Sequence, residues 1–399
     1  MPTLNELIKA YKSCRRYKRN TTNSTSYEIS YEEKIFHLHQ RISNHNYKPQ
    51  KSICFAVSYP KIREIFAANF NDRIIHHLII NRIEKHFENR FIFDSCACRN
   101  NKGGHFAVER LKMFENKITQ NKTQNAYFLQ LDIKSFFYNI DKQILMNILS
   151  QKLYTSSQSD KEYEENLWLM NKIIFHNPCE SYRLKGDLNL LKQLPKHKTL
   201  FNIPTNKGLP IGNLTSQFFA NVYLNELDQF IKRELKIRYY IRYADDMVIL
   251  HNNPKQLEKY IKIINNFLNN NLSLEIHPDK TKLNSVYKGI DFLGYYVKPQ
   301  YTLTRRRITQ NLKKKLYYFN QGFLLLETNC KEEAVAIHNP PKQEELESIC
   351  RSMNSLLGHI TWSNSYNFRQ NIYHKHLGIL FEYLEPQNNL TSYRVIKKS

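Results

Sequence analysis

Apolar residues recur at helical spacing in three long segments of the chain. In residues 70–87, FNDRIIHHLIINRIEKHF, apolar side chains such as Ile74 and Leu78 lie three or four positions apart, which predicts an amphipathic helix. We expect the basic face of this helix, opposite the apolar one, to be free for substrate. Residues 216–235 and 254–272 have the same periodicity, so we predict two further long helices there.

Two apolar segments predict β-strands that end at acids. Residues 125–133, NAYFLQLDI, read as an aromatic-rich strand that ends at Asp132. Residues 238–251, RYYIRYADDMVILH, predict a strand, a tight turn and a second strand, with Asp245 and Asp246 at the tip. Strands and helices therefore alternate around one acidic centre.

The remaining pattern completes an α+β protein. Residues 288–299, KGIDFLGYYVKP, predict a short hairpin or strand pair. From about residue 301 onward the chain becomes helical and basic, as in TRRRITQNLKKKLYYF, which indicates a separate helical subdomain. Residues 151–204 are polar and irregular, and we interpret them as an insertion to which the pattern assigns no role.

The charge balance favours a polyanionic partner. The chain has 59 Lys and Arg against 36 Asp and Glu, a formal net charge of +23. Basic groups near phosphates release condensed counterions, which favours nucleic acid. Anionic membrane is the competing partner, but no apolar run approaches the roughly 20 residues that span a bilayer. Because the N-terminal segment also lacks an apolar signal core, we expect a soluble, cytoplasmic protein that binds no membrane.

The cysteines and the aromatic residues give weaker evidence about function than the charge balance does. The seven cysteines are scattered, and the close pair Cys96 and Cys98 is spaced too tightly for a usual zinc knuckle, so we expect neither a structural metal nor a disulfide. Many of the 26 Tyr and 23 Phe stand among basic residues. Rings and cations together stack bases and hold phosphates, although a core and a solvated basic surface account for most of these residues.

The three acids suit nucleotidyl transfer. That reaction uses one metal ion to lower the pKa of the attacking hydroxyl and another to hold the triphosphate, and Mg²⁺ prefers oxygen ligands. We predict two Mg²⁺ ions, with Asp132 and Asp245 as direct ligands, Asp246 as ligand or electrostatic support, and the Ile133 carbonyl as an added ligand. The alternative is that adjacent acids cap a surface hairpin. The apolar flanks IRY and MVIL argue against it, because uncompensated carboxylates in a buried hairpin are costly.

Three motifs, in order along the chain, resemble those of the reverse transcriptases. LDIKSFFYNID around Asp132, then GLPIGNLTSQFFANVYLNELD, then YADD around Asp245 are similar to motifs A, B and C of that family. The resemblance extends from about residue 60 to residue 371. It implies a right-hand polymerase that copies RNA into DNA. The implied domains are an N-terminal extension and fingers in residues 1–124, a palm with an antiparallel sheet in 125–297 that contains the insertion 151–204, and a helical thumb in 298–399.

The resemblance also implies which residues bind the incoming dNTP. Phe137 looks like the aromatic gate beneath the sugar, whose ring would clash with a 2′-hydroxyl; its alternative role is core packing beside Phe136. Lys61 and Arg63, in PKIREI, resemble the basic fingers motif that grips the triphosphate. Arg73 is similar to the family's next basic position.

Further positions match the later motifs. Lys280, in HPDKTKL, resembles the motif D lysine proposed to protonate the departing pyrophosphate, and Lys282 is its close rival. FLGY looks like the primer grip that positions the growing 3′ end, which we assign to Phe292, Leu293 and Gly294. The basic helices of the thumb resemble those that track the minor groove of an RNA–DNA hybrid.

Departures in motif B narrow the subgroup. Many reverse transcriptases carry Gln-Gly and then Ser-Pro there, whereas this chain has Ile211-Gly212 and then Ser216-Gln217. IGNLTSQ, DSCACRNNKGGH and LLGHITWSNSYNFRQNI resemble the enzymes of diversity-generating retroelements, and related phage-defence enzymes share much of this framework. We assign Ile211, Gly212 and Gln217 to the dNTP site. Because isoleucine cannot hydrogen-bond the nascent base pair, we hypothesise relaxed discrimination against mismatches.

The family implies partners as well as substrates. These are a structured noncoding RNA template, an RNA–DNA hybrid, dNTPs, and a small basic accessory protein or a second defence protein. We expect no appended RNase H, integrase or nuclease domain in the chain, since the motifs and the thumb account for its length. Three alternatives remain: template-independent or protein-primed DNA synthesis, a non-catalytic RNA-binding scaffold, and a nucleotide cyclase. The cyclase should show a GGDEF-like hairpin.

Overall fold

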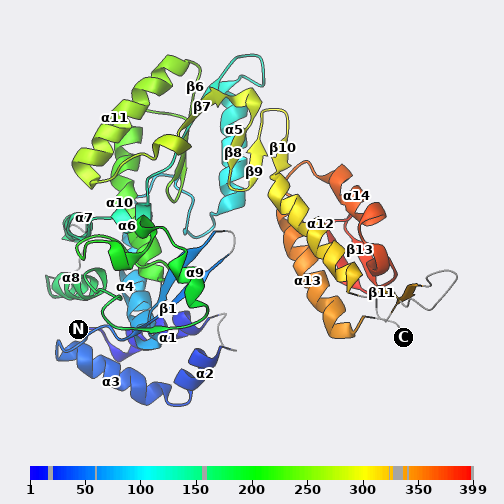
Figure 1. Ribbon diagram of the computed structural model, residues 1–399. Helices are drawn as coiled ribbons and strands as arrows, with labels where there is room; N and C mark the ends of the chain where they lie inside the picture. The colour runs from blue at the N-terminus through cyan, green and yellow to red at the C-terminus, as the bar shows by residue number, and fades with distance from the viewer. Residues whose placement is uncertain are drawn as a thin grey trace. The chain divides into compact units, whose positions relative to one another are not determined.

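A computed structural model describes residues 1–16, 21–58, 61–154, 160–322, 324–326, 336–338 and 341–396 (Figure 1). The chain forms two compact units. The first unit contains Met1–Gly103 and Leu129–Leu283, and the second contains Gly104–Phe128 and Asn284–Ser399. Strands β3 (Tyr127–Leu131) and β7 (Lys282–Ser285) each contain a boundary between the units.

The first unit is rich in helices. Its α-helices are α1 (Leu4–Arg15), α2 (Thr22–Glu28), α3 (Tyr31–Ser43), α4 (Phe70–Glu88), α6 (Phe136–Asn139), α7 (Lys142–Tyr154), α8 (Asp160–Ile174), α9 (Leu188–Lys192), α10 (Leu214–Gln229) and α11 (Pro254–Leu272). A π-helical turn, Phe230–Glu234, follows α10, and short 3₁₀ turns lie at Lys196–Lys198, Leu200–Asn202 and Pro278–Lys280. The helices predicted in residues 216–235 and 254–272 are therefore confirmed as α10 and α11.

Helix α4 confirms the helix predicted in residues 70–87, but the prediction that its basic face is free for substrate is wrong. Ile75 and His76 are buried in addition to the apolar stripe, because α1, α8 and α10 all contact this helix. Arg82 is tied down as well, since its Nη1 donates to Glu165 Oε1 at 3.0 Å. Packing from several sides thus occupies the face that the sequence pattern left open.

A small sheet in the first unit has the strand order β2-β1-β4. Strand β1 (Ser52–Val57) pairs antiparallel with β2 (Arg63–Ala67) and parallel with β4 (Tyr182–Leu184). Strand β4 lies within residues 151–204, and so does α8, so the described part of this segment is more regular than the prediction. It is also fixed to β2, because Thr199 Oγ1 donates to Glu64 Oε2 at 2.6 Å.

The central sheet has the order β5-β6-β3-β7. Strands β5 (Tyr240–Tyr243) and β6 (Asp246–His251) pair antiparallel, with Tyr243 opposite Asp246. They confirm the strand, turn and strand predicted in residues 238–251, and β3 confirms the strand that leads to Asp132. Helix α11 contacts β6, and α10 contacts α11. The candidate acids therefore lie where buried strands end.

The second unit combines one helix from the middle of the chain with its C-terminal part. Its elements are α5 (Gly104–Ile118), β8 (Ile290–Phe292), β9 (Tyr295–Val297), β10 (Thr302–Thr304), α12 (Arg306–Gln321), β11 (Leu324–Leu326), β12 (Ala336–His338), α13 (Gln343–Ile360), α14 (Tyr366–Lys375), β13 (Leu384–Gln387) and β14 (Ser392–Val395), with 3₁₀ turns at Val286–Lys288 and Gly378–Glu382. Strands β8 and β9 confirm the hairpin predicted in residues 288–299. The hairpin of β13 and β14 was not predicted.

Helices combined with mainly antiparallel strand pairs confirm the α+β class. A cluster of buried residues from α12, α13, α14 and the β13–β14 hairpin gives the C-terminal part of the second unit its own core, including Leu316, Leu357 and Ile372. Among the residues described, no helix is both long and apolar enough to cross a bilayer.

Candidate active site

The turn between β5 and β6 presents two acids at the end of a buried ribbon. Ile241 and Val248 on the two strands are fully buried or nearly so, which anchors the ribbon in the core. Ala244 has a left-handed φ of 54°, a conformation that costs an L-residue roughly 1 kcal/mol or more. This reversal lets Asp246 pair with Tyr243 and leaves Asp245 at the tip.

Asp132 is held where β3 ends. Its carbonyl accepts a hydrogen bond from the His277 amide at 2.8 Å, and the Lys134 amide donates to the Glu275 carbonyl at 3.0 Å. These two bonds flank a bridge between Ile133 and Ile276, so the segment after α11 fixes the acid's backbone. Neither bond involves the Ile133 carbonyl.

Electrostatics connect Asp132 with Asp245. Burial raises the pKa of Asp245, and the negative charge of Asp132 raises that pKa further, while Lys280 and Arg63 act in the opposite direction. Lys280 also forms an ion pair with the carboxylate of Asp132. The structure therefore brings together two of the predicted acids and two of the predicted basic residues. The rival lysine, Lys282, is an exposed residue that begins β7.

The donor set suits a hard cation. Asp132 is only 8% exposed, and two like-charged carboxylates in a buried setting repel each other unless a cation lies between them. Oxygen ligands of this kind are those that Mg²⁺ prefers. Among the described residues, however, no group of three or more His, Cys, Asp or Glu side chains is arranged to hold a metal ion. Convergence of all three acids on shared ions thus stays a prediction, and the role of Asp246 with it.

The predicted gate residue is anchored to the segment that precedes α10. Phe137 is half-buried, and its carbonyl accepts a hydrogen bond from the Leu209 amide at 2.8 Å. Its ring lies edge-on to that of Phe136, with centroids 5.4 Å apart. Motif A is therefore linked directly to the start of motif B, while Phe137 as a sugar gate remains a prediction.

Ile211 and Gly212 lie against β2. The Ile211 carbonyl accepts from the Phe66 amide at 2.9 Å. Gly212 has a φ of +116°, and a Cβ atom added there would meet Ile65 Cγ2 at 2.7 Å, so only glycine fits this close approach. Gln217 is exposed on α10 and accepts a hydrogen bond from Cys98 Sγ at 3.6 Å.

The three basic residues predicted to grip the triphosphate differ in their surroundings. Arg63 is exposed at the start of β2, and its charge acts on Asp245. Lys61 is exposed two residues earlier. Arg73 is half-buried on α4, and its Nε donates to the Ala68 carbonyl at 2.8 Å. Of these three residues, Arg63 is therefore the one whose positive charge lowers the pKa of Asp245.

The predicted primer grip lies in the second unit, at the turn between β8 and β9. Phe292 is buried, Leu293 has a φ of 51° and Gly294 one of 94°. A Cβ atom on Gly294 would meet His359 Nε2 at 3.0 Å. The turn is therefore shaped by close packing, and its role in holding a primer remains a prediction.

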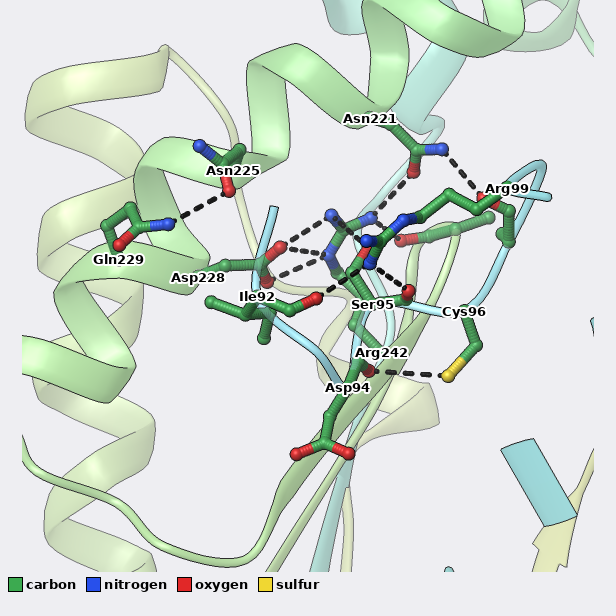
Figure 2. A network of polar contacts seen from close by, with 12 residues as sticks. Ile92, Asp94, Ser95, Cys96, Arg99, Asn221, Asn225, Asp228, Gln229 and Arg242 are labelled. Atoms are coloured by element: carbon green, nitrogen blue, oxygen red, sulfur yellow. Dashed lines mark hydrogen bonds and ion pairs between the residues drawn. The ribbon is translucent and has the colours of Figure 1, made fainter. Parts of the chain in front are cut away.

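One residue near the acids was missed by the sequence reasoning. Arg242, two residues before the turn, is fully buried and paired with Asp228 on α10 (Figure 2). The available signal was its register, because a charged residue that alternates with buried apolar neighbours on a strand requires a partner.

Comparisons with known proteins identify the family and several relatives of low identity. The family described as "Reverse transcriptase (RNA-dependent DNA polymerase)" matches residues 48–297. Protein YkfC of Escherichia coli (strain K12) is 23% identical over 280 residues, which cover 62% of this chain and 66% of that protein. The group II intron-encoded protein LtrA of Lactococcus lactis subsp. cremoris is 22% identical over 350 residues, which cover 71% and 53%.

Among solved structures, apo telomerase from Candida tropicalis aligns with a TM-score of 0.42 at 11% identity, covering 67% of this chain and 59% of that one. The chain spans between about half and two thirds of the length of the two curated relatives. The family match covers more than half of the chain and includes Asp132, Asp245 and Asp246. The chain therefore belongs to the reverse transcriptase family.

Proposed function

We propose that the chain is an RNA-directed DNA polymerase that makes cDNA by nucleotidyl transfer. The observation that carries this proposal is the effect of the Asp132 charge on Asp245, since these acids come from motifs more than a hundred residues apart. Asp132 and Asp245 are two acids at the ends of buried strands, and burial together with the charge of Asp132 raises the pKa of Asp245. They are what a polymerase of this family needs at the site of bond formation.

The proposed cofactor is a pair of Mg²⁺ ions. Asp132 and Asp245 would hold them, with Asp246 and the Ile133 carbonyl as further ligands. When bound, such ions lower the pKa of the primer hydroxyl and neutralise the charge of the leaving pyrophosphate.

The chain's own residues supply the remaining functions. Arg63, whose charge reaches Asp245, would hold the triphosphate electrostatically, together with Lys61 and Arg73. Lys280 would protonate the leaving pyrophosphate, since its ion pair with Asp132 places its ammonium group beside the acids. Phe137 would exclude the 2′-hydroxyl of an rNTP by contact with the sugar.

Primer extension on an RNA template tests the activity. Purified protein with Mg²⁺ and dNTPs should extend a DNA primer, and Asp245→Asn should reduce the rate by about 1,000-fold or more, because a ligand of the proposed metal ions is lost. Asp279→Asn serves as the matched control, since Asp279 is an exposed acid on a neighbouring segment. If Asp245→Asn extends primers as fast as the control, the enzyme proposal is wrong.

We propose further that the template is a dedicated structured noncoding RNA, in a diversity-generating retroelement or an anti-phage defence system. The support is the resemblance of IGNLTSQ and two other segments, together with the formal net charge of +23. Sequencing the RNA and cDNA that co-purify with the protein separates the two systems. Errors at template adenines indicate diversification, whereas repeats or homopolymers indicate defence. Incubation with single dNTPs and no template detects template-independent synthesis.

Ile211 provides a specific test of the diversification proposal. Its backbone is fixed by the hydrogen bond from Phe66, so Ile211→Gln changes the side chain at a defined position. An amide there can hydrogen-bond the nascent base pair, and we expect a lower misincorporation rate at template adenines. An unchanged error spectrum would remove the argument from this residue.

A further inference from the structure

The guanidinium of Arg242 is paired with one carboxylate in a fully buried setting. Arg242 and Asp228 both have 0% exposed side chains. Arg242 Nη2 donates to Asp228 Oδ2 at 2.6 Å, and Nε donates to Oδ1 at 2.8 Å (Figure 2). Tyr240 donates its hydroxyl to the same carboxylate at 2.7 Å. The ion pair is thus bidentate and desolvated.

The other N–H groups of Arg242 extend to three different segments. Nη2 donates to Ser95 Oγ at 2.9 Å, and Nη1 donates to Asn221 Oδ1 at 3.1 Å. Nη1 also donates to the Ala244 carbonyl at 3.0 Å. An arginine side chain has five N–H donors, and all of them are used here.

The backbone of Arg242 belongs to the same network. Its amide donates to the Asp94 carbonyl at 3.0 Å, and its carbonyl accepts from the Cys96 amide at 2.9 Å. The segment around Ser95 therefore runs alongside β5 (Figure 2). Arg99 stabilises the fold of this segment, since its Nη1 donates to the Ser95 carbonyl at 2.7 Å.

Asn221 and Arg99 tie the network to two helices. Asn221 on α10 donates its Nδ2 to the Ala97 carbonyl at 2.8 Å. Arg99 Nε donates to Glu88 Oε1 on α4 at 2.9 Å. The segment around Ser95, α10 and the acidic turn therefore meet at the guanidinium of Arg242, and Arg99 links that segment to α4.

We propose that Arg242 is a positioning residue for DNA synthesis, which holds the Ala244 carbonyl and so keeps Asp245 in place for catalysis. This inference rests on the proposed function. Ala244 has a left-handed backbone, and such strain persists only where its surroundings impose it. The bond from Arg242 Nη1 is a direct restraint of this kind, one residue before the acid.

The alternative is that the ion pair only stabilises the fold. Buried ion pairs replaced by apolar residues of similar volume often leave stability unchanged or improved. The double variant Arg242→Met/Asp228→Leu should then keep the stability of the wild type. It would still lack the hydrogen bond to the Ala244 carbonyl. The double variant therefore separates the two explanations.

The experiment compares steady-state synthesis by four variants on oligo(dT) annealed to poly(rA), with dTTP. They are Arg242→Met/Asp228→Leu, Arg242→Lys, Arg82→Met/Glu165→Leu and Asp245→Asn. The Arg82 variant is the matched control, because Arg82 is another buried arginine, with a 9% exposed side chain and an ion pair to Glu165. Melting temperature and primer–template affinity are measured on every variant.

The double variant at Arg242 should melt close to the wild type, yet its kcat should fall about 10- to 100-fold, since small displacements of catalytic groups have effects of that size. The KM for dTTP and the primer–template affinity should change less than about threefold. Arg242→Lys keeps the charge opposite Asp228 but has only three donors on one nitrogen, so it should lose kcat as well. It also provides the test if the double variant does not fold. The Arg82 variant should keep its kcat.

Wild-type kcat in both Arg242 variants would overturn the positioning role, provided that Asp245→Asn is inactive in the same assay. An equal loss of kcat in the Arg82 variant would overturn it too, because the loss would then follow from disturbing any buried arginine. If Asp245→Asn itself stays active, the proposed function fails. The two failures are therefore distinguishable.

Discussion

Two buried charge clusters lie close together along the chain and differ in how their charges are neutralised. Around Arg242, burial disfavours the charged guanidinium, but the charge and hydrogen bonds of Asp228, together with smaller contributions from Tyr240 and Cys96, outweigh burial and raise the pKa of Arg242. Around Asp245, burial and the charge of Asp132 both raise the pKa of the acid. The first cluster is neutralised within the protein, whereas at the second the positive charges of Lys280 and Arg63 do not outweigh burial and the charge of Asp132.

This difference separates structural from functional charge. A complete buried network fixes neighbouring segments, and removal of one member leaves an unpaired charge. An incomplete cluster is compensated only when a ligand supplies the missing charge. The first unit of the molecule contains both kinds of cluster. The Ala244 carbonyl, which accepts a hydrogen bond from Arg242 and precedes Asp245, connects the two.

The largest expected effect comes from neutralising each of the two acids, Asp245 and Asp228, in turn. Asp245→Asn should abolish synthesis while stability stays the same or rises, since a carboxylate with a raised pKa is removed. Asp228→Asn should lower the free energy of unfolding by about 3–5 kcal/mol, because Arg242 loses its counter-charge. Denaturant unfolding and primer extension on both variants check this. A strongly destabilised Asp245→Asn would break the comparison.

The two lysines of HPDKTKL should differ by a smaller factor. Lys280 pairs with Asp132, whereas Lys282 is exposed at the start of β7. Lys280→Met should reduce kcat about 100-fold, the lower end of what loss of a general acid costs, with little change in stability because the lysine is half-exposed. Lys282→Met should stay within about threefold of wild type. Single-turnover rates measure both, and the reverse order would reassign the lysine of motif D.

Adjacent phenylalanines extend the contrast to apolar residues. Phe136 is 3% exposed, so Phe136→Val should destabilise the fold by about 1–3 kcal/mol and leave sugar discrimination unchanged. Phe137→Val should lower the preference for dTTP over UTP about tenfold or more, because the predicted clash with the 2′-hydroxyl is relieved. Competition between the two nucleotides measures the preference. Unchanged discrimination in Phe137→Val would leave core packing as its only role.

The sequence predicted the elements whose pattern is local. Helix α11 matches its predicted range, and the ribbon around Asp245 follows from apolar residues on either side of a turn. The pairing of Asp132 with Asp245 followed from chemistry, since one reaction requires both acids.

What the sequence did not predict depends on contacts between distant segments. Strand β4 has only three residues, too few for a visible alternation. His76 on α4 is buried by packing from several helices, which no local pattern contains. The pairing of Arg242 with Asp228 joins a strand to a helix, so the register of Arg242 indicates that it needs a partner, but no local pattern identifies Asp228 as that partner.

Glu115 tests whether a buried acid without a compensating partner always marks a functional site. It is a fully buried residue of α5 in the second unit, and neither carboxylate oxygen has a hydrogen-bond partner among the described residues. Burial raises the pKa of Glu115 to about 8. In the folded protein, the Glu115 carboxyl group is therefore protonated and uncharged at pH values below about 8. It then needs no ligand to neutralise it.

Because the pKa of Glu115 is higher in the folded than in the unfolded chain, its contribution to stability is fully present at pH values below the unfolded-state pKa. This contribution disappears as the pH rises through the folded-state pKa of about 8. Wild-type stability should thus fall between about pH 5 and pH 8 by roughly 1–3 kcal/mol. Glu115→Gln should match the wild type near pH 5, be more stable near pH 8, and leave kcat unchanged. Melting curves across this range check the prediction. A loss of synthesis in Glu115→Gln would show that this buried acid also serves the reaction, and that lack of a partner, rather than proximity to a second acid, identifies functional carboxylates in this protein.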